Sequence, residues 1–153
     1  MCWSLVLHLC HRGYAASEVI ALPTGNGKRP TSGAEADSWV AIIDDHESMR
    51  SCLGRVMRIE GIRAATFASA EAYLDDASPT APCCLVLDMQ LPGMSGPKLA
   101  QFLERERPPL PPIIFISAHD DLLTSLEGSH LVHGRLRKPF ETDALLALVT
   151  PLL

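Results

Sequence analysis

The sequence predicts an α/β fold, a three-layer doubly wound arrangement in which helices cover both faces of a five-stranded parallel sheet. From residue 39 onward, short apolar runs alternate with stretches of helical periodicity, and five such strand–helix units follow one another. Unbroken apolar runs are typical of parallel strands that are buried on both faces. In doubly wound sheets the ligand site lies beyond the carboxyl ends of the strands, so polar residues are expected there.

The first two strand–helix units follow this pattern closely. WVAIID (39–44) is an apolar run that ends in acids, and residues 46–60 repeat apolar side chains at three-and-four spacing, as an amphipathic helix does. Gly61 is expected to end this helix. The second strand is expected at RAATF (63–67), and a helix over 69–77 opens on a serine, which is a good N-cap.

The rest of the chain repeats the alternation. The expected elements are the strand CCLVLD (83–88), a helix around Leu99, Phe102 and Leu103 that ends at RPPLPP, the strand IIFISA (113–118), a weak helix over 120–128, a strand over 132–137 and a last helix marked by Leu145, Leu148, Val149 and Leu152.

The composition is that of one ordinary globular domain. The chain has 153 residues, 47% of them hydrophobic and 20% charged, which suits a single core. A net charge of −5 disfavours a nucleic-acid binder, because such proteins need a basic face, and it favours protein partners. The five cysteines show no zinc-ligand spacing, and unpaired thiols in apolar runs fit a reducing cytosol. We therefore expect a cytoplasmic protein.

The first 38 residues differ in character from the rest. Residues 23–38, PTGNGKRPTSGAEADS, lack apolar periodicity and are rich in the residues typical of flexible linkers. The apolar residues 3–10 are few, are interrupted by His8 and have no positive leader, so neither a signal peptide nor a membrane segment is expected. The sequence therefore predicts an N-terminal extension and linker over residues 1–38 and a folded domain over residues 39–153.

Polar residues follow four of the expected strands. They are Asp44 and Asp45 after the first strand, Asp88 after the third, Ser117 after the fourth and Lys138 after the fifth. Three neighbouring carboxylates repel one another, and Mg²⁺, which prefers one or two carboxylates with phosphate oxygens and water, relieves this repulsion. An Asp carboxylate is a recognised nucleophile toward phosphorus, while a metal ion and an ammonium group withdraw charge from a phosphoryl group. The set is therefore chemically sufficient for phosphoryl transfer to Asp.

Each of these residues taken alone has a simpler explanation. An acidic pair can merely end a strand, an Asp before a Pro-Gly turn commonly initiates that turn, and a lone Lys is usually a solvated surface charge. The six histidines show no metal-ligand spacing on one helix and are expected on the surface or in loops. Only the joint occurrence of the polar residues at matched strand ends favours a site.

From about Trp39 to the C-terminus, the chain resembles a response-regulator receiver domain of two-component signal transduction, closest in style to the FixJ-like group. The strings that carry the resemblance are IIDDHESMR, TFASAEAYL, LVLDMQLPGMSG, IIFISAH and RKPF, and their order and spacing are more specific than any one of them. The resemblance implies a flavodoxin-like fold with strand order 2-1-3-4-5.

The resemblance also implies a magnesium site. Asp44 and Asp45 would form the acidic pair of this site, and Asp45 and Asp88 would be direct Mg²⁺ ligands. The backbone carbonyl of Gln90 would complete the site. The cofactor expected from the resemblance is therefore Mg²⁺ alone.

Asp88 would be the phospho-acceptor of such a domain. Ser117 would hydrogen-bond the phosphoryl group, and Lys138, followed by a Pro139 that receivers usually hold in cis, would form an ion pair with it. The phosphoryl group would come from the phosphohistidine of a sensor histidine kinase or a histidine phosphotransfer protein. The chain would then be a phospho-accepting signalling domain in a phosphorelay and not an enzyme in the ordinary sense.

Two features depart from the family pattern. Receivers usually carry Tyr or Phe three residues before the conserved Lys, and here that position is Arg135, which cannot bury as a neutral ring does. The segment before the last strand lacks the expected Gly-Ala turn, and Gly128 weakens the preceding helix. After Lys138 only residues 139–153 remain, so we expect a stand-alone receiver whose output is protein–protein interaction.

Two other functions stay open as alternatives. A phosphorylation-independent receiver that acts as an interaction module would explain Arg135, and a homodimer is compatible with either function. A phosphotransferase of the haloacid dehalogenase class is disfavoured, because those enzymes place a second Asp two residues after the nucleophile, where this chain has Gln90.

Overall fold

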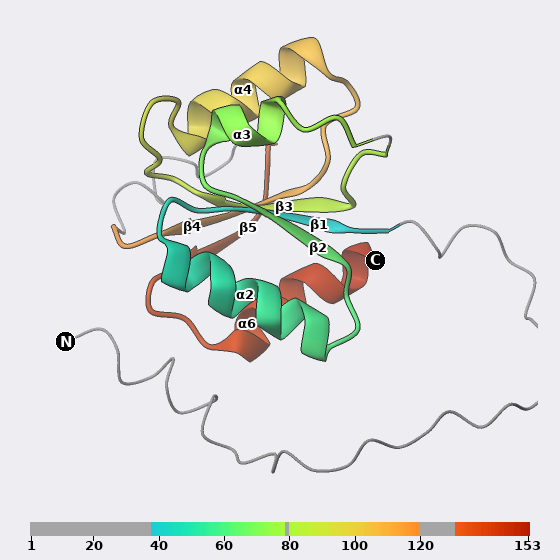
Figure 1. The fold of residues 1–153 in the computed structure, drawn as a ribbon, viewed down its shortest axis with the longest axis vertical. Coiled ribbons are helices and arrows are strands. Elements are labelled where there is room, and N and C mark those ends of the chain that lie inside the picture. Colours follow the sequence, from blue (N-terminus) through green and yellow to red (C-terminus); the bar gives the residue numbers. More distant parts are fainter. Residues whose placement is uncertain (1–37, 79, 120–130) are drawn as a thin grey trace, which may run out of the picture. The chain divides into compact units, whose positions relative to one another are not determined.

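The structure is a computed structural model that describes residues 38–78, 80–119 and 131–153, drawn in colour in Figure 1. The expected linker, apart from Ser38, and the expected helix over 120–128 lie outside the described residues. None of the helices in the described part of the chain is both long and apolar enough to cross a membrane.

The sheet has five parallel strands in the order β2-β1-β3-β4-β5, as the resemblance implies. The strands are β1 (Val40–Ile43), β2 (Ala64–Phe67), β3 (Cys84–Asp88), β4 (Ile113–Ser117) and β5 (Val132–Arg137). Every residue of the three inner strands is buried, whereas residues of the edge strands β2 and β5 alternate in exposure. The expectation that the strands are buried on both faces therefore holds for β1, β3 and β4. It is wrong for the edge strands β2 and β5, which are not covered on both faces.

Helices cover both faces of the sheet, which confirms the three-layer arrangement. In Figure 1, α3 and α4 lie on one face, and α2 and α6 lie on the other. The helices are α2 (Glu47–Ile59), α3 (Ala70–Leu74), α4 (Gly96–Glu106) and α6 (Thr142–Val149), and α6 is followed by a short 3₁₀ helix (Thr150–Leu152).

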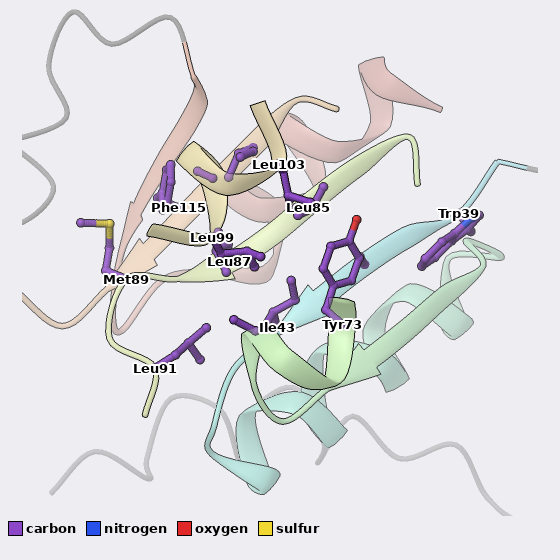
Figure 2. Close-up of a cluster of buried hydrophobic side chains, with 14 residues drawn as sticks. Trp39, Ile43, Tyr73, Leu85, Leu87, Met89, Leu91, Leu99, Leu103 and Phe115 are labelled. Atoms are coloured by element: carbon purple, nitrogen blue, oxygen red, sulfur yellow. The ribbon is translucent and has the colours of Figure 1, made fainter. Parts of the chain in front are cut away.

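Two hydrophobic clusters hold these layers together. Figure 2 shows the cluster on the α3 and α4 face, where Leu87 and Phe115 of the sheet pack with Tyr73 of α3 and Leu99 of α4. The other cluster joins the sheet to buried residues of α2 and α6. Because the core lies on both faces, the carboxyl edge of the sheet is left for polar groups.

The helix expected over 69–77 is shorter than expected. Its N-cap is confirmed, since the Ser69 hydroxyl accepts a hydrogen bond of 3.1 Å from the Ala72 N–H. The helix ends at Leu74, however, and the four residues that follow are all exposed. With no apolar side chain left to bury, those residues gain nothing from another helical turn.

Gly96, the first residue of α4, lies directly against the end of β3. A Cβ at this position would stand 2.2 Å from the Asp88 carbonyl oxygen and 3.1 Å from Met89 Cα. Both neighbours are backbone atoms that cannot swing away. We therefore expect Gly96→Ala to lower the free energy of unfolding by about 2 kcal/mol through overpacking, measured by urea denaturation. Gly54→Ala within α2 is the matched control, since its Cβ would meet only the Thr66 methyl at 3.3 Å; equal stability losses in the two variants would contradict this account.

Candidate functional site

Three carboxylates meet at the carboxyl edge of the sheet, as the sequence predicts. Asp44 and Asp45 follow β1, and Asp88 is the last residue of the neighbouring strand β3. In the described part of the chain they form one group with His46, in which one ligand atom of each residue lies within 4.8 Å of the others. Asp44 is fully buried and Asp88 is 4% exposed, whereas Asp45 is open to solvent. The oxygen atoms are the hard donors that Mg²⁺ prefers, so this acidic cluster is compatible with Mg²⁺.

Lys138 bridges two of these carboxylates. It follows the edge strand β5, and its Nζ donates to Asp44 Oδ2 at 2.7 Å and to Asp88 Oδ2 at 2.5 Å. Its backbone N–H also donates to the Ser117 carbonyl at 2.7 Å, which anchors the residue to β4. The Lys138–Pro139 peptide bond is cis, in agreement with the resemblance. The ammonium group therefore lies between the acidic pair and the expected phospho-acceptor.

Burial and the lysine have opposite effects on Asp88. Burial raises the pKa of the Asp88 carboxyl, and the hydrogen bond and charge of Lys138 only partly offset this. For Lys138 itself, burial would lower the pKa, but the hydrogen bonds and charges of Asp44 and Asp88 outweigh burial and raise it. The lysine thus stays protonated, and Asp88 is a more basic carboxylate than an ordinary surface Asp. Greater basicity favours a nucleophilic role.

The same local turn fixes the polar side chain at three of the strand ends. A side-chain oxygen at the end of the strand accepts a hydrogen bond from the backbone N–H two residues further along. This orients the side chain before any ligand arrives. The three bonds join Asp44 Oδ1 to the His46 N–H at 2.8 Å, Asp88 Oδ1 to the Gln90 N–H at 2.9 Å and Ser117 Oγ to the His119 N–H at 3.0 Å.

Ser117 and Arg135 differ in burial. Ser117 is fully buried, and it lies one residue beyond Ile116, the residue that pairs with Asp88 on the neighbouring strand. Arg135 is exposed on the edge strand β5. The structure therefore brings Ser117 to the edge that carries the acids and leaves Arg135 exposed on the edge strand.

Two residues that sequence reasoning missed also contact the acidic pair. His46 is mostly exposed, as expected, but its Nδ1 lies 2.9 Å from Asp45 Oδ1. Arg50 donates from Nη1 to the backbone carbonyl oxygens of both Asp44 and Asp45, at 2.8 Å each. Their closeness along the sequence was the available signal, because one residue follows the pair directly and the other lies in the first turn of the next helix.

The loop after Asp88 is tied to α3 by Glu71. Its Oε1 accepts a hydrogen bond of 3.0 Å from the Met94 N–H. Gly93 makes room for this contact: its φ is +76°, and a Cβ there would stand 2.8 Å from the same oxygen. Hydrogen bonds from the backbone N–H groups of Glu71 and Met94 lower the pKa of the Glu71 carboxyl below its ordinary value of 4.5.

We expect Glu71→Gln to lower the thermal midpoint at neutral pH, because the amide loses the charge that strengthens this bond. Since the pKa is lowered in the folded state, the contribution of the charge is present above the ordinary Glu pKa and is lost as pH falls through the lowered pKa. The midpoints of wild type and variant should therefore converge in acid. A gap in midpoint that widens as pH falls would contradict this assignment.

Comparisons with known proteins identify the family of this chain. A family model for the response regulator receiver domain matches residues 40–150. The response regulator protein TmoT of Ectopseudomonas mendocina is 34% identical over 122 residues, which cover 75% of this chain and 52% of TmoT. The transcriptional regulatory protein FixJ of Bradyrhizobium diazoefficiens is 31% identical over 111 residues, which cover 72% of this chain and 54% of FixJ. The chain thus spans about half the length of these two relatives.

A solved structure shares the same fold. The crystal structure of the response regulator protein TrrA from Thermotoga maritima, in complex with Mg(2+)-BeF, superimposes with a TM-score of 0.67 at 24% sequence identity. The alignment covers 76% of this chain and all of that one. Fold, strand order and the matched family model agree, and we conclude that the chain belongs to the response regulator receiver domain family.

Proposed function

We propose that this receiver accepts a phosphoryl group on Asp88 from the phosphohistidine of a sensor histidine kinase or a histidine phosphotransfer protein, with Mg²⁺ as cofactor. The observation that carries the proposal is the position of the Asp88 carboxylate at the end of β3, in contact with Lys138 and beside the acidic pair. Transfer forms a bond between an Asp88 oxygen and phosphorus and breaks the bond between phosphorus and the donor imidazole nitrogen.

Three residues of the chain prepare this step. The Asp88 carboxylate is already oriented by the Gln90 N–H. Lys138 keeps Asp44 as one partner, so its ammonium can turn from Asp88 to a phosphoryl oxygen without losing its anchor. The Ser117 hydroxyl accepts from the His119 N–H and keeps its own proton to donate to another phosphoryl oxygen.

The contacts within the acidic cluster favour different roles in metal binding for the different carboxylates. Both oxygens of Asp44 are engaged, Oδ2 by Lys138 and Oδ1 by a backbone N–H, which favours an indirect role in metal binding. Asp45 is open to solvent and suits a direct ligand, together with Asp88 and the Gln90 backbone carbonyl. Mg²⁺ bound there would neutralise charge on the incoming phosphoryl oxygens.

The output of the domain is a separate proposal. FixJ is described as a transcriptional regulatory protein, and the chain spans about half of it. For the domain itself we propose cytoplasmic signalling through protein contacts without binding to nucleic acid, since the net charge is −5 and nucleic-acid binding needs a basic face.

A second candidate function is a receiver that works without phosphorylation. Arg135 favours it, because an exposed cation occupies the β5 position where receivers carry an aromatic side chain. Such a domain would keep the fold and bind its partner in one fixed state.

Intact-protein mass spectrometry after incubation with acetyl phosphate and Mg²⁺ separates the two candidates. The proposed function predicts the addition of one phosphoryl group, and no addition when EDTA removes the metal. An unchanged mass in Mg²⁺, with circular dichroism showing an intact fold, would instead support the phosphorylation-independent receiver.

A further inference from the structure

We infer that Arg50 is a positioning residue that holds the loop of the acidic pair in the geometry that binds Mg²⁺. This inference rests on the proposed function, because it assigns a role toward the same metal. Arg50 does not belong to the carboxylate cluster itself; it acts on the backbone that carries two of the carboxylates.

A single side-chain nitrogen of Arg50 binds the backbone carbonyls of both residues of the acidic pair. Nη1 donates one hydrogen bond to the Asp44 carbonyl and one to the Asp45 carbonyl, each at 2.8 Å. Its own backbone N–H donates to the His46 carbonyl at 3.0 Å, in the first turn of α2. The helix therefore begins immediately after the loop, and the guanidinium folds back over that loop.

The loop needs such a partner because the chain leaves the sheet here. The Asp44 N–H still bonds to the Phe67 carbonyl at 3.2 Å, as part of the pairing with β2. The next two carbonyls accept from Arg50 and not from a strand. Fixing both carbonyls fixes the peptide planes on either side of Asp45, and these planes set the direction of its Cα–Cβ bond. The open carboxylate of Asp45 is thereby aimed through its backbone.

Geometry and charge have opposite consequences for metal affinity at this position. Three carboxylates, one ammonium and one guanidinium leave one formal negative charge at the site. Removing the guanidinium would strengthen the electrostatic attraction for a dication. Releasing the two carbonyls would instead let the loop adopt several conformations, which weakens metal binding. Two short charge-assisted hydrogen bonds are strong and local, while one partly exposed charge is screened by salt and water. The effect on loop geometry therefore outweighs the effect on charge, and loss of Arg50 weakens Mg²⁺ binding.

The test is a calorimetric titration of the full chain with MgCl₂. For Arg50→Met, which keeps the length and loses the donors, we expect the Mg²⁺ dissociation constant to rise about tenfold, as for partners that orient metal ligands. Arg50→Lys keeps the charge and part of the donor capacity, so its Mg²⁺ dissociation constant should lie between those of wild type and Arg50→Met. Arg55→Met is the matched control, because it removes an exposed charge from the same helix and should leave the constant unchanged.

The results that overturn the inference are distinct. An unchanged or tighter constant in a folded Arg50→Met would show that charge and not geometry dominates. Loss of the fold in Arg50→Met, with Arg50→Lys at wild-type affinity, would make Arg50 a purely structural residue. A positioning role also predicts that saturating Mg²⁺ restores the wild-type rate of phosphorylation. If wild type binds Mg²⁺ but never gains a phosphoryl group, the proposed function fails while the role of Arg50 can still be read from the titration.

Discussion

Replacing Asp88 with asparagine should abolish the gain of a phosphoryl group from acetyl phosphate. The amide has the shape of the carboxylate, and its oxygen can still accept the hydrogen bond from the Gln90 N–H that orients the side chain. Lys138 keeps its bond to Asp44, so the edge of the sheet stays assembled. The substitution removes the ion pair between Asp88 and Lys138 and the nucleophile, because an amide oxygen does not attack phosphorus as a carboxylate does. Intact-protein mass spectrometry checks this result.

An exposed carboxylate provides the control for Asp88. Asp76 lies beyond the end of α3 and is exposed, so Asp76→Asn should gain the phosphoryl group as wild type does. Phosphorylation that persists in a folded Asp88→Asn would place the acceptor elsewhere and remove the basis of the proposed function.

Replacing Lys138 with methionine should produce the largest loss of stability. The substitution removes the ammonium that contacts the buried carboxylates of Asp44 and Asp88 and leaves their charges without a partner. Breaking a buried pair on one side costs about 3 kcal/mol, and we expect a loss of this size in the free energy of unfolding, measured by urea denaturation in EDTA. Because Mg²⁺ can supply the missing positive charge, its addition should stabilise Lys138→Met more than it stabilises wild type.

Lys98 offers a matched comparison for Lys138. It is an exposed lysine on α4, and Lys98→Met should change the free energy of unfolding by less than about 0.5 kcal/mol. If Lys138→Met were as stable as Lys98→Met in EDTA, the ammonium would not be compensating the carboxylates. The electrostatic account of the site would then be wrong.

The parts of the site that the sequence predicted follow from one rule of sheet geometry. Parallel strands present their carboxyl ends at one edge, so Asp44, Asp88 and Lys138 could be brought together from strand positions alone. The inner strands were equally predictable, because full burial demands apolar side chains on both faces. The short turns after the strands added orientation that residue type already favours, since Asp and Ser accept such bonds readily.

Other contacts could not be predicted in this way, because they depend on how individual side chains fold over loops. The hydrogen bonds from Arg50 to two carbonyls require one particular conformation of a long side chain, and residue spacing along the helix does not determine that conformation. The contact between His46 and Asp45 depends in the same way on the turn between them. The early end of α3 after Leu74 reflects the lack of apolar side chains to bury, which a capping signal at its start does not reveal.

Localisation of the phosphoryl group tests the central claim most directly. Aspartyl phosphate is reduced by borohydride to homoserine, so tandem mass spectrometry of protein treated with acetyl phosphate, Mg²⁺ and borohydride identifies the modified residue. The account predicts conversion of Asp88 and of no other acidic residue, and its disappearance in EDTA. Conversion of Asp44 or Asp45, or none at all in folded, Mg²⁺-bound protein, would contradict it.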